Sequence, residues 1–91
     1  MATLKLKKPA MINGEETSEI EYDLDELTGK DIQDATKELQ KRGIIVSVVE
    51  TDPNYQAMLF AMASGLSYED IQKLGAKDYN DIIILVRDFF L

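Results

Sequence analysis

The chain has 91 residues, a formal net charge of −7 and neither Cys nor His. Its length predicts one small domain, and its acidic balance opposes binding to nucleic-acid phosphates or to anionic membrane surfaces. Without Cys and His there are no disulfides, no thiol nucleophile, none of the usual zinc sites and no imidazole base, so only carboxylate chemistry remains.

The first residues do not resemble a secretory signal. Lys5, Lys7 and Lys8 are followed by no apolar run of signal-peptide length, and no stretch approaches the roughly 18–20 residues that span a bilayer. We therefore expect a cytoplasmic protein with no membrane or nucleic-acid partner, no cofactor and no metal.

Two half-buried strands are expected first, because apolar residues alternate with lysines and then with acids. The apolar positions are Leu4 and Leu6, then Ile20, Tyr22 and Leu24. A two-residue turn at Asn13-Gly14 would place Leu6 opposite Glu21 and mix the two faces. We therefore predict an odd-length loop, with Gly14 left-handed and a bulge beside it, which aligns Lys5 and Lys7 with acids of the second strand.

The second strand is strongly acidic, with seven acids and no base between Glu15 and Glu26. A solvated strand face and a site for a metal or a basic partner are both compatible with this composition. The solvated face is favoured, since ligands spread along a strand do not converge as those of a calcium loop do.

Three helix starts share one pattern, at 27–32, 66–71 and 74–79: an apolar residue, a cap, two spacers, an acid and an apolar residue. The first helix is predicted over about 29–42, with Ile32, Ala35 and Leu39 inward, and Gly43 ends it. The β-branched run 44–49 predicts either a third strand or a segment that orders on a partner's sheet edge.

A second helix is predicted from Asp52-Pro53 to Ser64, and no residue of 57–63 is polar. Tyr55, Met58, Leu59 and Met62 form one stripe, and Phe60 projects to the opposite side. Either this helix is central and packed on two sides, or one face of it is offered to a partner, for which flexible methionines are suited.

After a short helical turn over 68–74, the last stretch, 76–91, predicts an amphipathic helix. Ile84 and Leu91 fall within its polar arc, and no Gly, Asn or basic residue follows Phe89 and Phe90 to close it. No catalytic residue is predicted. The candidate partner-binding residues are Met58, Phe60, Met62, Ile84, Phe89, Phe90 and Leu91.

Four stretches in order resemble the small tail assembly chaperones of tailed phages and prophages. They are LKLKKPAMINGEE, EYDLDELTGKDI, YQAMLFAMASGLSYEDI and AKDYNDIIILVRDFFL, and together they cover nearly the whole chain except 42–52. The resemblance implies a non-enzymatic protein, absent from the finished virion, that binds the tape measure protein and helps tail tube protein polymerise around it. Self-association through 44–49 is left open, because that run matches nothing in the family pattern.

The resemblance also implies that such families often make a longer product by ribosomal frameshifting. Codons for Phe89-Phe90-Leu91 can form an uninterrupted run of U, on which ribosomes slip backwards. We expect a minority of chains to continue past Leu91 and to recruit tube protein through the added segment.

The predicted fold is α+β: a β-hairpin over about 3–25, with the third strand left open, then three or four helices over about 29–91, in one domain. Two other functions stay open at this point. One is a small acidic regulatory or inhibitory module that mimics nucleic acid with 15–26, and the other is an enzyme that uses Asp or Glu. Capture of a tail protein, or of a nucleic-acid-binding enzyme, separates the chaperone from the mimic.

Overall fold

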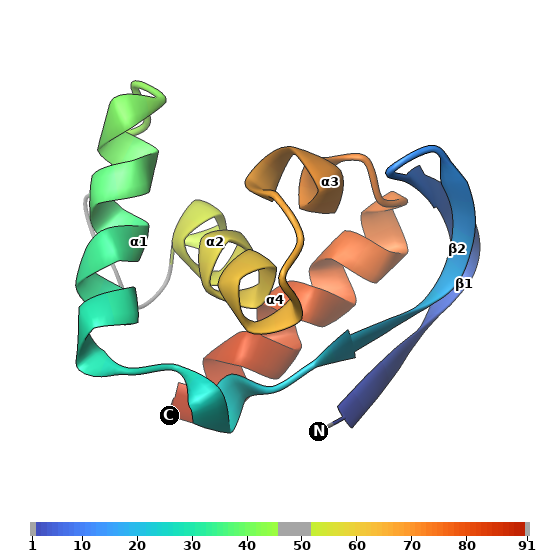
Figure 1. The fold of residues 1–91 in the computed structure, drawn as a ribbon, viewed down its shortest axis with the longest axis horizontal. Helices are drawn as coiled ribbons and strands as arrows, with labels where there is room; N and C mark the ends of the chain where they lie inside the picture. The colour runs from blue at the N-terminus through green and yellow to red at the C-terminus, as the bar shows by residue number, and fades with distance from the viewer. Residues whose placement is uncertain (1, 46–51, 91) are drawn as a thin grey trace.

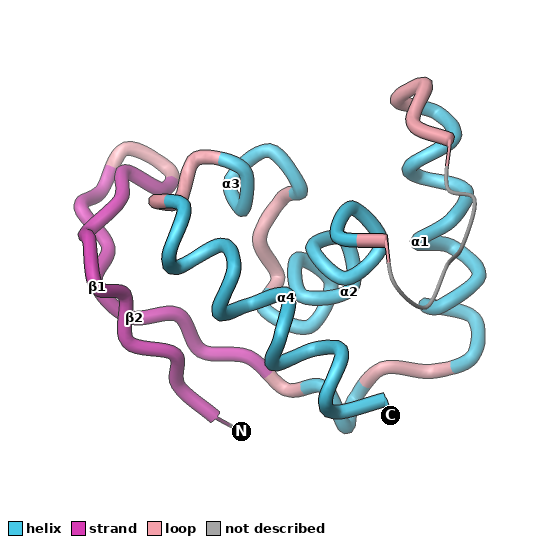
Figure 2. Tube along the Cα trace, turned by 180° about the vertical axis from the view of Figure 1, so that it is seen from behind, coloured by secondary structure: helices cyan, strands magenta, loops and turns pink. Residues whose placement is uncertain are grey.

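A β-hairpin comes first in the chain and four helices follow it, in a computed structural model that describes residues 2–45 and 52–90 (Figure 1). The elements are β1 (Ala2–Ile12), β2 (Glu15–Tyr22), the 3-10 turn η1 (Leu24–Glu26), α1 (Gly29–Lys41), α2 (Pro53–Ser64), α3 (Tyr68–Gln72) and α4 (Ala76–Phe90). The predicted α+β class is confirmed, with the helical part packed on one side of the hairpin (Figure 2).

Helix α2 occupies the centre of the fold. It packs against α1, α3, α4, β2 and η1, with α1 and α4 on either side of it (Figure 1). The six consecutive residues 56–61 are all buried, so no side of this helix segment faces solvent. Phe60 is fully buried, and the centre of its ring lies 5.1 Å from the centre of the Tyr22 ring. The interpretation of α2 as a central helix is therefore confirmed.

The hairpin turn differs from the prediction. Asn13 and Gly14 form a two-residue turn with φ of 53° and 80°, the positive pair that hairpin turns favour. The register of the two strands differs between the two ends of the hairpin. Near the turn Ile12 pairs with Glu15, whereas near the open end Leu4 pairs with Ile20, so the side chains of Leu4 and Ile20 both face the core. Gly14 is left-handed as predicted, whereas the predicted odd-length loop is wrong.

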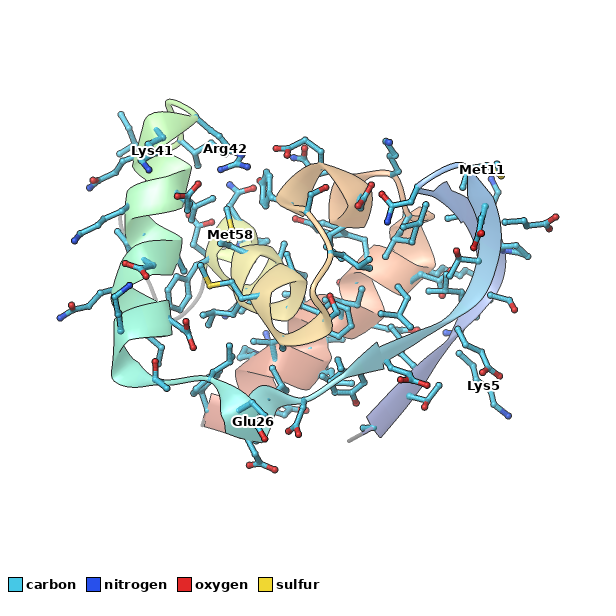
Figure 3. The ribbon with its side chains drawn as sticks, in the orientation of Figure 1. Lys5, Met11, Glu26, Lys41, Arg42 and Met58 are labelled. Carbon is cyan, nitrogen blue, oxygen red and sulfur yellow. The ribbon has the colours of Figure 1, made fainter. Side chains whose placement is uncertain are left out.

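The change of register lies in the middle of β1 and not beside Gly14. Lys5 pairs with Glu19 and Ala10 with Thr17, so the four residues 6–9 lie opposite the single residue 18. Pro9 has no N–H to donate and is tolerated at such an irregularity. Lys5 is opposite an acid, as predicted, and points into solvent (Figure 3). Lys7 lies in the irregular segment instead, and its Nζ lies 2.8 Å from Asp81 of α4.

Asp78 of α4 stabilises this irregular segment. Its carboxylate accepts hydrogen bonds from the backbone N–H groups of Lys7, at 2.8 Å, and Lys8, at 3.1 Å, and the residue is only 2% exposed. The predicted role of Asp78 as the acid of a capping box is therefore wrong, because both oxygens are directed to β1. A carboxylate bound to two N–H groups replaces the ladder bonds that the change of register removes from β1.

The observed ends of the helices lie close to those predicted from the sequence. The capping boxes of Thr28 with Asp31 and of Ser67 with Asp70 are both present, and Gly43 and Gly65 are left-handed after their helices. α1 ends at Lys41, α3 at Gln72 and α4 at Phe90. Among the described residues the sheet has two strands, and most of the run 44–49 lies outside them, as does Leu91.

Arg42 joins the end of α1 to the start of α3. Its Nε lies 2.8 Å from Glu69 Oε2, and its Nη1 lies 3.1 Å from Glu38 Oε2. The guanidinium also lies over the ring of Tyr68, 5.4 Å from its centre, and points from α1 toward α3 (Figure 3). The hydrogen bond from Arg42 lowers the pKa of Glu69, and hydrogen bonds from Lys41 and then Arg42 lower the pKa of Glu38.

We expect Asp78→Ala to reduce the free energy of unfolding by about 2–4 kcal/mol, because it leaves two backbone donors of β1 without their charged acceptor. Asp81→Ala is the matched control, since it removes the same charge from the same helix but breaks only an exposed ion pair with Lys7. Chemical denaturation measures both. Equal, small losses for the two variants would show that Asp78 does not hold the hairpin.

The contact between Arg42 and Glu69 should depend on pH. Because the pKa of Glu69 in the folded state is below the ordinary value of 4.5, the pairing stabilises the fold above that pH and is lost as the pH falls through the lowered value. A double-mutant cycle with Arg42→Met and Glu69→Gln should give a favourable coupling at pH 7 that disappears in acid. A coupling that stays unchanged however far the pH is lowered below 4.5, while the protein remains folded, would contradict this.

Candidate partner-binding surface

The buried face of α4 continues beyond the core at its C-terminal end. Ile82, Ile83 and Val86 are buried against the rest of the fold. One turn later on the same side, Phe89 and Phe90 are 45% and 44% exposed. Their rings form an edge-to-face pair with centres 4.9 Å apart. We call Phe89 and Phe90 the aromatic end of α4, a pair of large apolar rings that the described chain covers only in part.

A groove lies beside the aromatic end. It is formed where the C-terminal end of β2 and the turn η1 meet the last turns of α4. Its volume is about 460 Å³, and we call it the acid-lined groove. It is lined by Ala2, Tyr22, Asp23, Leu24, Asp25, Leu85, Asp88 and Phe89. Four large apolar side chains and three acidic ones therefore share one concave surface, and no described residue that lines it is Lys or Arg.

The local sequence explains how η1 forms one wall of the groove. Asp23 caps η1, since its carboxylate accepts the backbone N–H of Asp25 at 3.1 Å. The N–H of Asp23 in turn donates to the carbonyl of Ala63 at 3.0 Å, which ties this junction to the end of α2. Leu24 is buried, and Asp25 is exposed next to it. The wall is therefore held by its own side-chain cap and by one backbone hydrogen bond to the end of α2.

The predicted partner-binding residues separate into three groups. Phe60 and Met58 are buried in the core and do not contribute to the surface of the folded chain, and Met62 is half-buried against that core. Ile84 is 38% exposed on the opposite side of α4 from the buried stripe. Among the predicted residues that the structure describes, only those of the aromatic end combine exposure with a neighbouring groove. Leu91 lies outside the described residues.

The acidic strand is a solvated face in this structure. Glu15, Glu16, Glu19 and Glu21 are all exposed, and Glu19 lies opposite Lys5. Within 2–45 and 52–90, no three His, Cys, Asp or Glu side chains are grouped so that they could hold a metal ion. None of the helices in that part of the chain has the length and apolar character needed to cross a membrane.

Sequence reasoning missed the groove itself. The alternation of Asp23, Leu24 and Asp25 is visible in the sequence, but it was assigned to the end of a strand. Nothing in the local pattern indicates that this junction lies against Leu85 and Phe89, more than sixty residues later in the chain. Only the packing of α4 across the hairpin brings the two segments together.

Exposed aromatic rings beside a concave surface are typical of sites that bind other proteins. A family model described as phage tail assembly chaperone proteins, E, or 41 or 14, matches residues 3–91. The chain therefore belongs to the phage tail assembly chaperone family, which is not a family of enzymes and whose members bind tail proteins. No curated protein and no solved structure gave a match to the chain.

Matched substitutions should separate the core from the surface. Phe60→Ser should lower the free energy of unfolding by about 3–5 kcal/mol or prevent folding, because it empties the centre of the core. Ile84→Ser should leave the melting temperature nearly unchanged, because that side chain already contacts solvent. Thermal denaturation followed by circular dichroism measures both. Similar destabilisation by the two variants would show that Ile84 is a core residue.

Proposed function

We propose that this protein binds the tape measure protein in the host cytoplasm and assists polymerisation of the tail tube around it. The exposure of Phe89 and Phe90 on the core-facing side of α4 is the observation that carries the proposal. A tape measure protein is a long, largely helical chain, and its apolar faces associate wrongly until the tube covers them. The aromatic end of α4 offers such faces a temporary partner.

The size of the aromatic end suits reversible binding. Full burial of one Phe side chain contributes about 1.5–3 kcal/mol, and the two rings are only 45% and 44% exposed, so the pair supplies roughly 1–3 kcal/mol before the cost of association. Such a contact contributes to shielding an apolar face when many copies are present. It is also weak enough for polymerising tube protein to displace, as a chaperone absent from the finished structure requires.

The charge of the chain supports the same function. A net charge of −7 gives bound copies the same sign, so an apolar client covered by them is kept apart from other covered clients. Glu15, Glu16, Glu19 and Glu21 are on exposed positions of β2, so they remain available for this repulsion when the aromatic end is occupied.

Co-expression with the tape measure protein tests the proposal. Wild-type chain should keep the tape measure protein in the supernatant after ultracentrifugation and copurify with it. The double variant Phe89→Ser with Phe90→Ser should bind at least about tenfold more weakly, because both anchoring rings are lost.

Met11→Ser is the matched control, because Met11 is 58% exposed but lies near the hairpin turn, away from the aromatic end (Figure 3). It should bind as wild type does. Equal capture by the Phe89/Phe90 double variant would remove the aromatic end from the interface. Capture of a nucleic-acid-binding enzyme and of no tail protein would favour the acidic mimic over the chaperone.

A further inference from the structure

We propose that the acid-lined groove is the docking site for an amphipathic helix that inserts one apolar side chain and carries Lys or Arg on either side of it. This inference rests on the proposed function, since the helix is a segment of the tail protein client. It adds the chemistry by which that segment is recognised. Two features of the described residues lead to it: the apolar floor and the sign of the rim.

The floor of the groove fits an apolar anchor. Leu24 and Leu85 come from different segments of the chain and are packed against the core, and the ring of Phe89 borders them. An apolar side chain that enters here covers exposed parts of Phe89 without moving α4. Recognition of helices in grooves typically uses such anchors at positions three or four residues apart, and Phe90 lies next to the groove to contact the next one.

The rim of the groove selects the charge of the partner. Asp25 and Asp88 lie on its two walls, and among the described residues neither has a Lys or Arg partner. Several acids elsewhere on the described chain do have one: Asp34 with Lys30, Glu38 with Lys41 and Arg42, and Asp81 with Lys7. A flanking Lys or Arg would therefore gain contacts with Asp25 and Asp88 that the described residues do not already provide.

The same charges disfavour a second copy of this chain as the occupant. Each copy carries a net charge of −7, so the approach of two copies at an acidic surface is opposed by their fields. The exposed lysines of α1 and β1 that could offset this repulsion are partly engaged in their own ion pairs, as Lys7, Lys30 and Lys41 show. A basic segment of another protein meets no such opposition.

Two synthetic helical peptides test the inference on the full chain. Both carry the same leucine stripe, one with lysines at the flanking positions and the other with glutamates. In titrations of isotopically labelled protein, the lysine peptide should shift the amide signals of Leu24, Asp25, Leu85 and Phe89. It should bind on the order of tenfold more tightly than the glutamate peptide, and added salt should reduce this difference.

Variants of the rim provide the matched comparison. Asp25→Asn with Asp88→Asn should weaken binding of the lysine peptide by about three- to tenfold and leave binding of the glutamate peptide unchanged or improved. Glu16→Gln with Glu19→Gln removes the same charge from the exposed strand and should have no such effect. Phe89→Ala should weaken binding of both peptides, since it removes the apolar contact that they share.

Several results would overturn the inference. These are equal binding of the two peptides, signal changes away from the groove, no binding at all, and rim variants that behave like wild type. Self-association abolished by Phe89→Ala would assign the groove to a second copy. If the peptide docks but the tape measure protein is not captured on co-expression, the proposed function is refuted and the groove remains a binding site. If the tape measure protein is captured and the rim variants do not change the capture, the groove is refuted as its binding site and the proposed function remains.

Discussion

The fold depends on one constraint, the burial of the middle of α2, residues 56–61, on every side. A helix whose residues 56–61 are all buried has no polar face to turn toward water, so it is stable only when other elements enclose it. α1, α3, α4, β2 and η1 supply this enclosure. The small side chains of Ala57 and Ala61 let neighbours approach closely, while Phe60 fills the space toward Tyr22. The positions of the other helices follow from the need to cover this one.

Local sequence signals predicted most of this architecture, and the failures arose where a distant residue decided the outcome. Caps, left-handed glycines and proline at a helix start act within a few residues, so the ends of α1 and α2 were predicted closely. In the hairpin, the register that the two-residue turn sets would not place the apolar residues of the two strands opposite one another. The chain resolves this mismatch at residues 6–9, where Asp78 accepts the displaced N–H groups, and no local pattern pairs Lys7 with a residue of the last helix.

The same distinction applies to the binding surface. The exposure of Phe89 and Phe90 was foreseen, because an apolar stripe that runs to the end of the last helix is visible in the sequence. Phe60 was harder to place, since the spacing of a helix shows which residues share a side but not how many sides the fold covers. The acid-lined groove could not be predicted from the sequence, because Leu24 and Leu85 come together only through tertiary packing.

The aromatic end is best understood as a continuation of the core that the described residues cover only in part. Phe89 and Phe90 follow Ile82 and Val86 along one face of α4, so an apolar client would extend the packing that already stabilises the domain. Such a surface recognises apolar character without demanding one sequence, which suits a long client with many similar faces. Apolar contact alone, however, would also favour contact between copies of this chain. In the docking that we propose, the acids beside Phe89 supply the discrimination, because they repel another acidic copy and attract a basic client, so that specificity arises from charge and affinity from the rings.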